Sequence, residues 1–224
     1  MTDRKLFREA AVKLNLGLIL LGILLFIPAG SFGFTGAWIF IAILFVPMTA
    51  AGIVMLKKSP ELLRKRLGAK ESENEQKTVV MLSGIMFLLA FILAGLDFRF
   101  SWTAVPETVQ YISAAVFLIG YALYLRVLYE NAYLSRTVEV QEGQKVIDTG
   151  LYGTVRHPMY LSTLIMFLMM SLVLGSLISF AVICMYIPVI VKRIKNEEKV
   201  LASGLEGYRD YMEKVRYRLV PFIW

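Results

Sequence analysis

The chain has 224 residues, of which 58% are hydrophobic and 18% are charged. Soluble domains usually carry about 25% charged residues, so this composition argues against an ordinary soluble domain. The formal net charge of +7 does not indicate a nucleic-acid partner, because the basic residues flank apolar segments instead of forming one solvated face beside aromatic residues.

Five long apolar runs follow one another along the chain. A helix that crosses a bilayer needs about 20 mostly apolar residues, and these runs, with their flanks, are long enough for that role. They cover residues 14–28, 35–56, 78–96, 108–125 and 159–191. The runs therefore predict membrane-spanning helices.

The last run, residues 159–191, contains no charged residue and is interrupted at Gly175-Ser176. It predicts a helical hairpin whose arms are each a little short for a perpendicular crossing, with the second arm bent by Pro188. The runs together predict an all-α integral membrane protein, a polytopic helical bundle with about five to six membrane segments and a C-terminal helical hairpin. Membrane lipids are therefore expected partners.

Basic residues are concentrated on alternate connections between the runs. Lysine and arginine are frequent in the segment before the first run, in the connection between the second and third runs, and in the tail after the last run. Residues 29–34 and 97–107, by contrast, contain a single basic residue, Arg99. Basic loops stay on the cytoplasmic side of a membrane. We therefore expect both termini and the long connection 126–158 to face the cytoplasm.

The chain contains one cysteine, Cys184, and one histidine, His157. A single cysteine cannot form an intramolecular disulfide or a thiolate cluster. A single imidazole does not build a zinc site of several histidines. We therefore expect no metal.

Polar residues that can do chemistry lie mainly in two blocks that flank the hairpin. In the first block, residues 137–141 alternate like a short strand, and Gly150 suits a left-handed turn or the close approach of a ligand to the backbone. Pro158 suits the first turn of the hairpin helix. Arg156 and His157 are then expected at a helix N-terminus, which favours anions.

The second block follows the hairpin and contains Arg193 and Glu197, which are four residues apart and therefore share a helix face. The hairpin returns this face to the same side as His157. A guanidinium, a carboxylate, an imidazole and several tyrosines would then converge, and they could hold a zwitterionic cofactor. The same residues are also compatible with a helix cap and a solvated ion pair that contributes little energy.

One longer pattern runs through both blocks. It consists of Gln141, Gln144-Lys-Val-Ile147, Gly150-Leu-Tyr152, Arg156-His-Pro-Met-Tyr160, Arg193-x-x-x-Glu-Glu198 and Tyr208-x-x-Tyr211. With this pattern the chain resembles the isoprenylcysteine carboxyl methyltransferase family, which is related to the phospholipid methyltransferases. The string Gly-x-Tyr-x-x-x-Arg-His-Pro-x-Tyr is long and therefore specific.

The resemblance divides the chain into two parts. Residues 1–125 would be N-terminal transmembrane helices, and residues 126–224 would be a methyltransferase-type catalytic region with a cofactor loop, the hairpin and a cytoplasmic C-terminal helix. The chain is similar to the compact prokaryotic members of the family, which implies a prokaryotic cytoplasmic membrane with the active site on the cytoplasmic side.

The resemblance also implies a reaction. S-adenosylmethionine would donate a methyl group to a lipophilic acceptor, either a small molecule or a lipidated one, and a prenylcysteine-type carboxylate is one candidate. The positions carried over for cofactor binding are Gln141, Gln144, Lys145, Val146, Ile147, Tyr152, His157, Pro158, Met159, Tyr160 and Glu197.

The catalytic positions implied by the resemblance are Arg193, Glu198 and His157. Arg193 would face the acceptor, and His157 or Glu198 would help an amine acceptor to lose its proton. Gln144 stands where the eukaryotic enzymes have a histidine, and this difference weakens the case for a prenylcysteine acceptor.

Other functions stay open at this point. Within the methyltransferase class, the acceptor could be a phospholipid amine or a small thiol. A more distant alternative is an NADPH-dependent sterol-type reductase, because those enzymes carry a related C-terminal pattern that ends in Arg-His-Pro-x-Tyr. A non-enzymatic membrane protein is a third alternative, although the clear spans contain no charged residue in their middle, which argues against a transporter.

Overall fold

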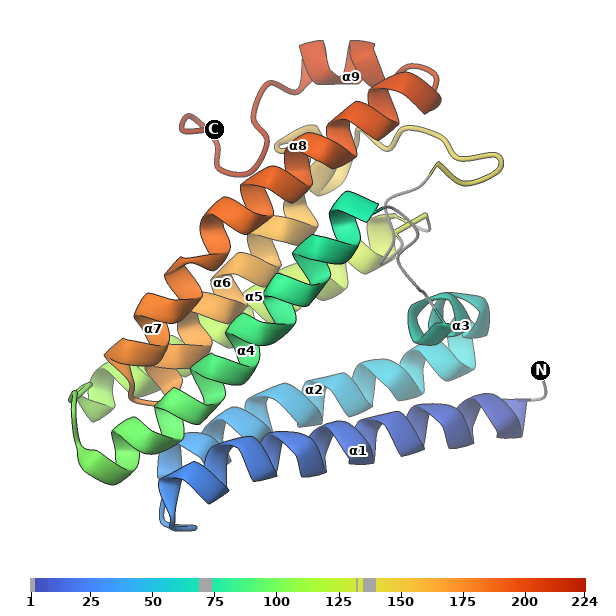
Figure 1. The fold of residues 1–224 in the computed structure, drawn as a ribbon. Helices are drawn as coiled ribbons and strands as arrows, with labels where there is room; N and C mark the ends of the chain where they lie inside the picture. Colours follow the sequence, from blue (N-terminus) through green and yellow to red (C-terminus); the bar gives the residue numbers. More distant parts are fainter. Residues whose placement is uncertain (1–2, 69–73, 132, 135–139) are drawn as a thin grey trace.

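Figure 1 shows the computed structural model, which describes residues 3–68, 74–131, 133–134 and 140–224. Over these residues the chain forms helices and no strand, so the predicted all-α fold is confirmed. The helices are α1 (Asp3–Ala29), α2 (Thr35–Lys58), α3 (Pro60–Gly68), α4 (Asn74–Phe100), α5 (Glu107–Glu130), the 3-10 turn η1 (Gly150–Gly153), α6 (Pro158–Val173), α7 (Leu177–Cys184), α8 (Tyr186–Gly204) and α9 (Tyr208–Lys214). The short strand expected at 137–141 falls mostly outside the described residues.

Five helical segments in the described part of the chain are long and apolar enough to cross a membrane. Four of them lie in α1, α2, α4 and α5. The fifth joins α7 and α8 over Leu177–Gly204, whereas α6 is shorter, with 16 residues. The predicted bundle of five to six membrane segments with a C-terminal hairpin is thereby confirmed.

The hairpin joins α6 to α7, and local sequence explains its shape. Gly175 adopts a left-handed backbone with φ +74°, and the Ser176 hydroxyl caps α7 by accepting a hydrogen bond from a first-turn N–H at 3.0 Å. The second arm is interrupted at Met185, between α7 and α8. Pro188 explains this break, because it has no N–H to donate to the carbonyl four residues earlier.

A buried aspartate fastens the hairpin turn to the neighbouring connection. Asp97 accepts hydrogen bonds from the Ser176 hydroxyl at 2.5 Å, from the Thr103 N–H at 2.7 Å and from the Thr103 hydroxyl at 2.5 Å. Three donors around one buried carboxylate offset its loss of hydration. The ends of α4 and α7 are thereby held together at the end of the bundle opposite α9 (Figure 1).

The apolar core forms where α5 packs on α6, α1 on α4, and α4 on α7. Its buried side chains include Phe40, Phe117, Met166, Met170 and Ile183. Many large apolar residues of the spanning helices point outward instead, as expected for helices that face lipid. At one end of the bundle, α8 leads into α9 and the C-terminal segment (Figure 1), and this end carries the polar residues singled out above.

The contact between α2 and α6 depends on the absence of a side chain at Gly36. A Cβ there would lie 2.7 Å from the Val173 carbonyl oxygen and 3.2 Å from the Leu174 Cα. Gly36→Ala should therefore push the helices apart and destabilise the protein by about 1–3 kcal/mol. Thermal unfolding in detergent should show a lower Tm for this variant.

The matched control is Gly52→Ala in the same helix, where a Cβ would meet open space. This variant should keep the wild-type Tm or raise it slightly, because alanine favours helix over glycine. Equal Tm values for Gly36→Ala and Gly52→Ala would contradict the close approach of α2 to α6.

Candidate active site

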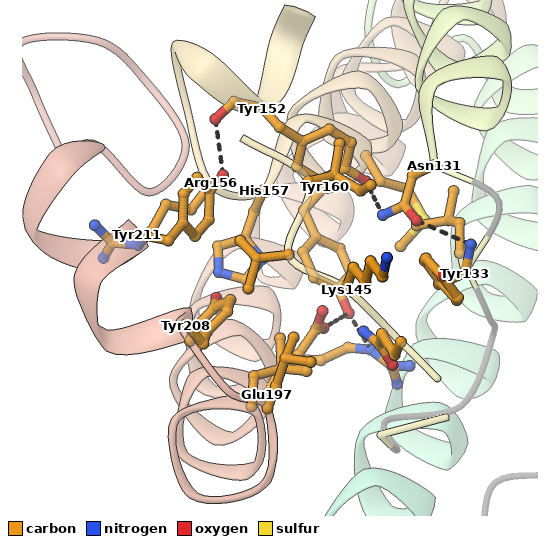
Figure 2. Close-up of a pocket in the computed structure, with 18 residues that line it drawn as sticks. Asn131, Tyr133, Lys145, Tyr152, Arg156, His157, Tyr160, Glu197, Tyr208 and Tyr211 are labelled. Atoms are coloured by element: carbon orange, nitrogen blue, oxygen red, sulfur yellow. Dashed lines mark hydrogen bonds between the residues drawn. The ribbon is translucent and has the colours of Figure 1, made fainter. Parts of the chain in front are cut away.

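A polar pocket lies at the end of the bundle where α8 leads into α9 (Figure 2). Its cavity volume is about 90 Å³. The walls come from the residues directly after α5, the segment 144–147, η1, the residues at the start of α6, the inner face of α8, and α9. The lining residues are Asn131, Tyr133, Leu134, Gln144, Lys145, Val146, Ile147, Tyr152, Arg156, His157, Met159, Tyr160, Arg193, Glu197, Leu201, Leu205, Tyr208 and Tyr211.

Tyr160 joins the two charged residues that α8 contributes to the pocket. Its hydroxyl donates a hydrogen bond to the Glu197 carboxylate at 2.5 Å and accepts one from the Arg193 Nε at 2.9 Å. The helical spacing predicted that Arg193 and Glu197 share a face, and the structure adds Tyr160 from the opposite arm of the hairpin between them. The pocket therefore presents a carboxylate and a guanidinium whose positions are fixed by one hydroxyl.

Glu198 lies behind the pocket and does not line it. Its carboxylate accepts hydrogen bonds from the Nε of Arg156 and the Nε of Arg218, both at 2.8 Å, and lies 3.3 Å from the His157 Nε2. The Glu198 and Arg156 side chains are only 5% and 4% exposed. His157 lines the pocket, and Glu198 contacts its ring from the side away from the pocket. The cluster therefore holds the ring in place.

The segment after α9 is hydrogen-bonded to the two residues that precede α6, Arg156 and His157. The Arg156 N–H donates to the Tyr217 carbonyl and the His157 N–H donates to the Arg218 carbonyl, both at 2.9 Å. The Arg156 Nη1 also donates to the Val215 carbonyl at 2.6 Å. Pro158 occupies the first turn of α6 as predicted. The backbone at Arg156 and His157 is thus fixed by residues about 60 positions away in the sequence.

Gly150 lets a carboxylate approach the backbone. Its φ is +60°, and a Cβ there would lie only 2.5 Å from the Glu130 carboxylate. The same carboxylate accepts a hydrogen bond from the Leu151 N–H at 2.9 Å. The left-handed turn predicted at Gly150 is confirmed, and the group that approaches the backbone is Glu130 from the end of α5.

This turn delivers Tyr152 to the pocket. The Tyr152 hydroxyl accepts a hydrogen bond from the Asn131 Nδ2 at 3.0 Å, and its carbonyl accepts one from the Tyr211 hydroxyl at 2.8 Å. Burial raises the pKa of Tyr152, Tyr208 and Tyr211, and the Glu197 carboxylate raises the pKa of Tyr208 further. These hydroxyls are therefore neutral at physiological pH, and each keeps a proton that it can donate.

Gln141 organises the segment that forms one wall. Its side-chain amide donates to the Tyr133 carbonyl at 2.6 Å, and its N–H donates to the Gln144 side-chain oxygen at 2.8 Å. The Tyr133 hydroxyl in turn donates to the carbonyl of Gly143 at 3.1 Å. Gln141 therefore shapes the loop rather than facing the pocket.

The structure brings most of the predicted site residues together. Those that line the pocket are Gln144, Lys145, Val146, Ile147, Tyr152, His157, Met159, Tyr160, Arg193 and Glu197. Three predicted residues lie outside the lining: Gln141, Pro158 and Glu198. They act on the loop conformation, the start of α6 and the His157 ring, respectively.

Several lining residues were not predicted as site residues. They are Asn131, Tyr133, Leu134, Arg156, Leu201, Leu205, Tyr208 and Tyr211. Leu201 and Leu205 continue the four-residue spacing of Arg193 and Glu197, so helical periodicity could have found them. Asn131 and Tyr133 follow a membrane helix, and no sequence signal indicates that they face a pocket.

The fold and the pocket define a polytopic helical membrane protein with a buried site of mixed charge at one end of the bundle. Residues 111–203 match the sequence model of the isoprenylcysteine carboxyl methyltransferase (ICMT) family. This segment of the chain is therefore similar to that family. The matched range runs from α5 into α8 and includes most of the pocket lining.

A curated relative bears on the reductase alternative. The mouse (Mus musculus) protein named Delta(14)-sterol reductase TM7SF2 is 30% identical to this chain over 91 residues. The similar segment is 39% of this chain and 22% of the mouse protein. The chain therefore matches about a fifth of the length of that relative.

Proposed function

We propose that the pocket binds S-adenosylmethionine and that the protein methylates a lipophilic acceptor drawn from the membrane. The observation that carries the proposal is the Glu197–Tyr160–Arg193 arrangement in a pocket that Lys145 also lines. S-adenosylmethionine carries an ammonium, a carboxylate, a sulfonium and a flat base. A carboxylate, two cations and several aromatic rings are the side chains that would recognise such a molecule.

The donor set fits the cofactor, and the cavity requires a rearrangement before the whole molecule can enter. Sites for molecules of this size are usually at least about 300 Å³, whereas the pocket measures about 90 Å³. We propose that residues 140–147 move to admit it, because this wall itself forms no helix. Glu197 would then hold the ammonium, and Lys145 the carboxylate.

S-adenosylmethionine would supply a methyl group that its sulfonium already activates. The side chains of the protein then have to orient the acceptor and exclude water. Arg193 would orient a carboxylate acceptor through its planar guanidinium. With an amine acceptor, His157 would take the proton, and Glu198 would hold the imidazole in place from behind.

We further propose how the chain is oriented in the membrane and which part of it carries the catalytic site. The basic residues in the first half of α1 and after the apolar run 159–191 support a cytoplasmic location for both termini and for the pocket end. Residues 126–224 would form the catalytic region, since every residue that lines the pocket lies between 131 and 211. Residues 1–125 would anchor it in the bilayer.

Calorimetry with purified protein tests the cofactor class. S-adenosylhomocysteine should bind, and Glu197→Gln should weaken its binding at least about tenfold, because one charge-assisted contact contributes about 1.5–3 kcal/mol. Glu206→Gln is the matched control, since Glu206 is exposed and outside the pocket. Unchanged affinity in Glu197→Gln would remove Glu197 from the cofactor site.

The same titration distinguishes the methyltransferase hypothesis from the reductase alternative, which the similarity to the mouse protein suggests. NADPH has several phosphate groups and no ammonium that the Glu197 carboxylate in the pocket wall could hold. Binding of NADPH without binding of S-adenosylhomocysteine would replace the proposed function by the reductase alternative.

A further inference from the structure

The helix α8 presents two chemically different faces. Its buried residues are Tyr186, Ile190, Arg193, Ile194 and Glu198, and they face the core and the site. The opposite side carries exposed residues at spacings of four, three and four, which places them along one line of the helix. These are Pro188, Lys192, Lys195 and Lys199. We call Lys192, Lys195 and Lys199 the lysine row.

A shallow hollow of about 320 Å³ follows this outer face. Pro188 and Val191 line its lower part, next to the apolar run that crosses the membrane, and the lysine row with Asn196 lines its upper part. Apolar residues at membrane depth with cations directly above them match the order of groups in a phospholipid, whose acyl chains lead up to a charged head group.

The lysine row lacks acidic partners within the described ranges, unlike Lys13 and Lys214. Lys13 pairs with Glu9, and Lys214 pairs with Asp148, both at 2.7 Å or less. Within the described ranges, no ion pair involves a lysine of the row. Three like charges on successive turns repel one another, and an external anion would relieve this repulsion.

We propose that the outer face of α8 binds the head group of an anionic phospholipid. The lysines begin directly after the apolar residues of α8, so long side chains reach the head-group level. Each lysine near an anionic lipid surface contributes about 1 kcal/mol. Pro188 and Val191 lie where the first carbons of the acyl chains would rest. The site is separate from the pocket, and it does not depend on the proposed methyl transfer.

Native mass spectrometry of the full chain in a mild detergent can count retained lipids. Wild-type protein should bind phosphatidylglycerol at least about tenfold more tightly than phosphatidylcholine. The triple variant Lys192→Gln/Lys195→Gln/Lys199→Gln should lose this preference. The triple variant Lys192→Arg/Lys195→Arg/Lys199→Arg should retain it, because the charges are kept.

The matched control removes the same number of charges elsewhere. Arg4→Gln/Lys5→Gln/Arg8→Gln changes three exposed basic residues of α1 and should bind phosphatidylglycerol like the wild type. Equal losses in the two glutamine variants would show that only net charge matters and would overturn the site. Equal affinity of the wild type for the two lipids would overturn it as well. If the lysine-row variant does not fold, Lys195→Gln alone should still halve the preference or more, and an unchanged preference would contradict the proposal.

Discussion

Arg193→Lys is expected to lower kcat/KM for the methyl acceptor by about tenfold to a hundredfold, because a charge-assisted contact of about 1.5–3 kcal/mol is lost. Arg193 is buried and donates its Nε hydrogen to Tyr160. A lysine keeps the charge but has no planar fork, so it cannot orient an acceptor carboxylate through the two parallel N–H bonds that a guanidinium offers. Affinity for S-adenosylhomocysteine should hardly change, because Glu197 provides the cofactor contact.

The assay first needs an acceptor, which a screen of prenylcysteine analogues, phosphatidylethanolamine and simple thiols with a labelled methyl donor would provide. Arg209→Lys serves as the matched control, since Arg209 is exposed and lies outside the pocket. Wild-type turnover in Arg193→Lys would mean that Arg193 has only a structural contact with Tyr160. Turnover with amines alone would indicate that His157, and not Arg193, is the residue that acts on the acceptor.

Glu198→Ala is expected to destabilise the protein by about 3–5 kcal/mol, the usual result of removing one partner from a buried ion pair. Without the carboxylate, the Arg156 guanidinium stays buried beside carbonyl groups and has no counter-charge. The Arg218 contact is lost too, which should loosen the segment after α9. A large drop in Tm and faster hydrogen exchange over residues 215–224 would show both effects.

Glu197→Ala is the comparison for this experiment, because the two glutamates are neighbours and differ in what they contact. Glu197 is partly exposed and accepts a hydrogen bond from Tyr160, so its removal should change cofactor affinity with little loss of stability. If Glu198→Ala fails to fold, Glu198→Gln should fold with an intermediate Tm. A Tm of Glu198→Ala equal to that of the wild type would contradict the role of this cluster.

Much of the fold could be predicted from local properties of the sequence. Long runs without charge predict spanning helices because each span must satisfy its own backbone. Gly175-Ser176 predicts the hairpin turn, since it combines a left-handed residue with a helix cap. Pro188 predicts the interruption of the second arm, because a proline removes one helix hydrogen bond. In each case the cause lies within a few residues of its effect.

The arrangement of the site could be predicted only in part. The shared face of Arg193 and Glu197 follows from helical spacing, but nothing local indicates that Tyr160 bridges them from the other arm. The approach of Glu130 to Gly150 likewise joins residues from two different elements. Gln141 lies outside the pocket lining, and its side chain donates to the Tyr133 carbonyl eight residues away, a contact that no local signal predicts; its role toward the cofactor stays a prediction.

The short length of α6 limits the depth at which the pocket would lie in a bilayer. With 16 residues and a rise of 1.5 Å per residue, α6 measures about 24 Å, whereas the hydrocarbon layer is about 30 Å thick. If the Asp97 end reaches one boundary of this layer, the first turn of α6 stops about 6 Å short of the other. His157 and Tyr160 would then lie in a recess below the head groups. A molecule anchored by an apolar tail can reach this recess by sideways diffusion, without leaving the bilayer.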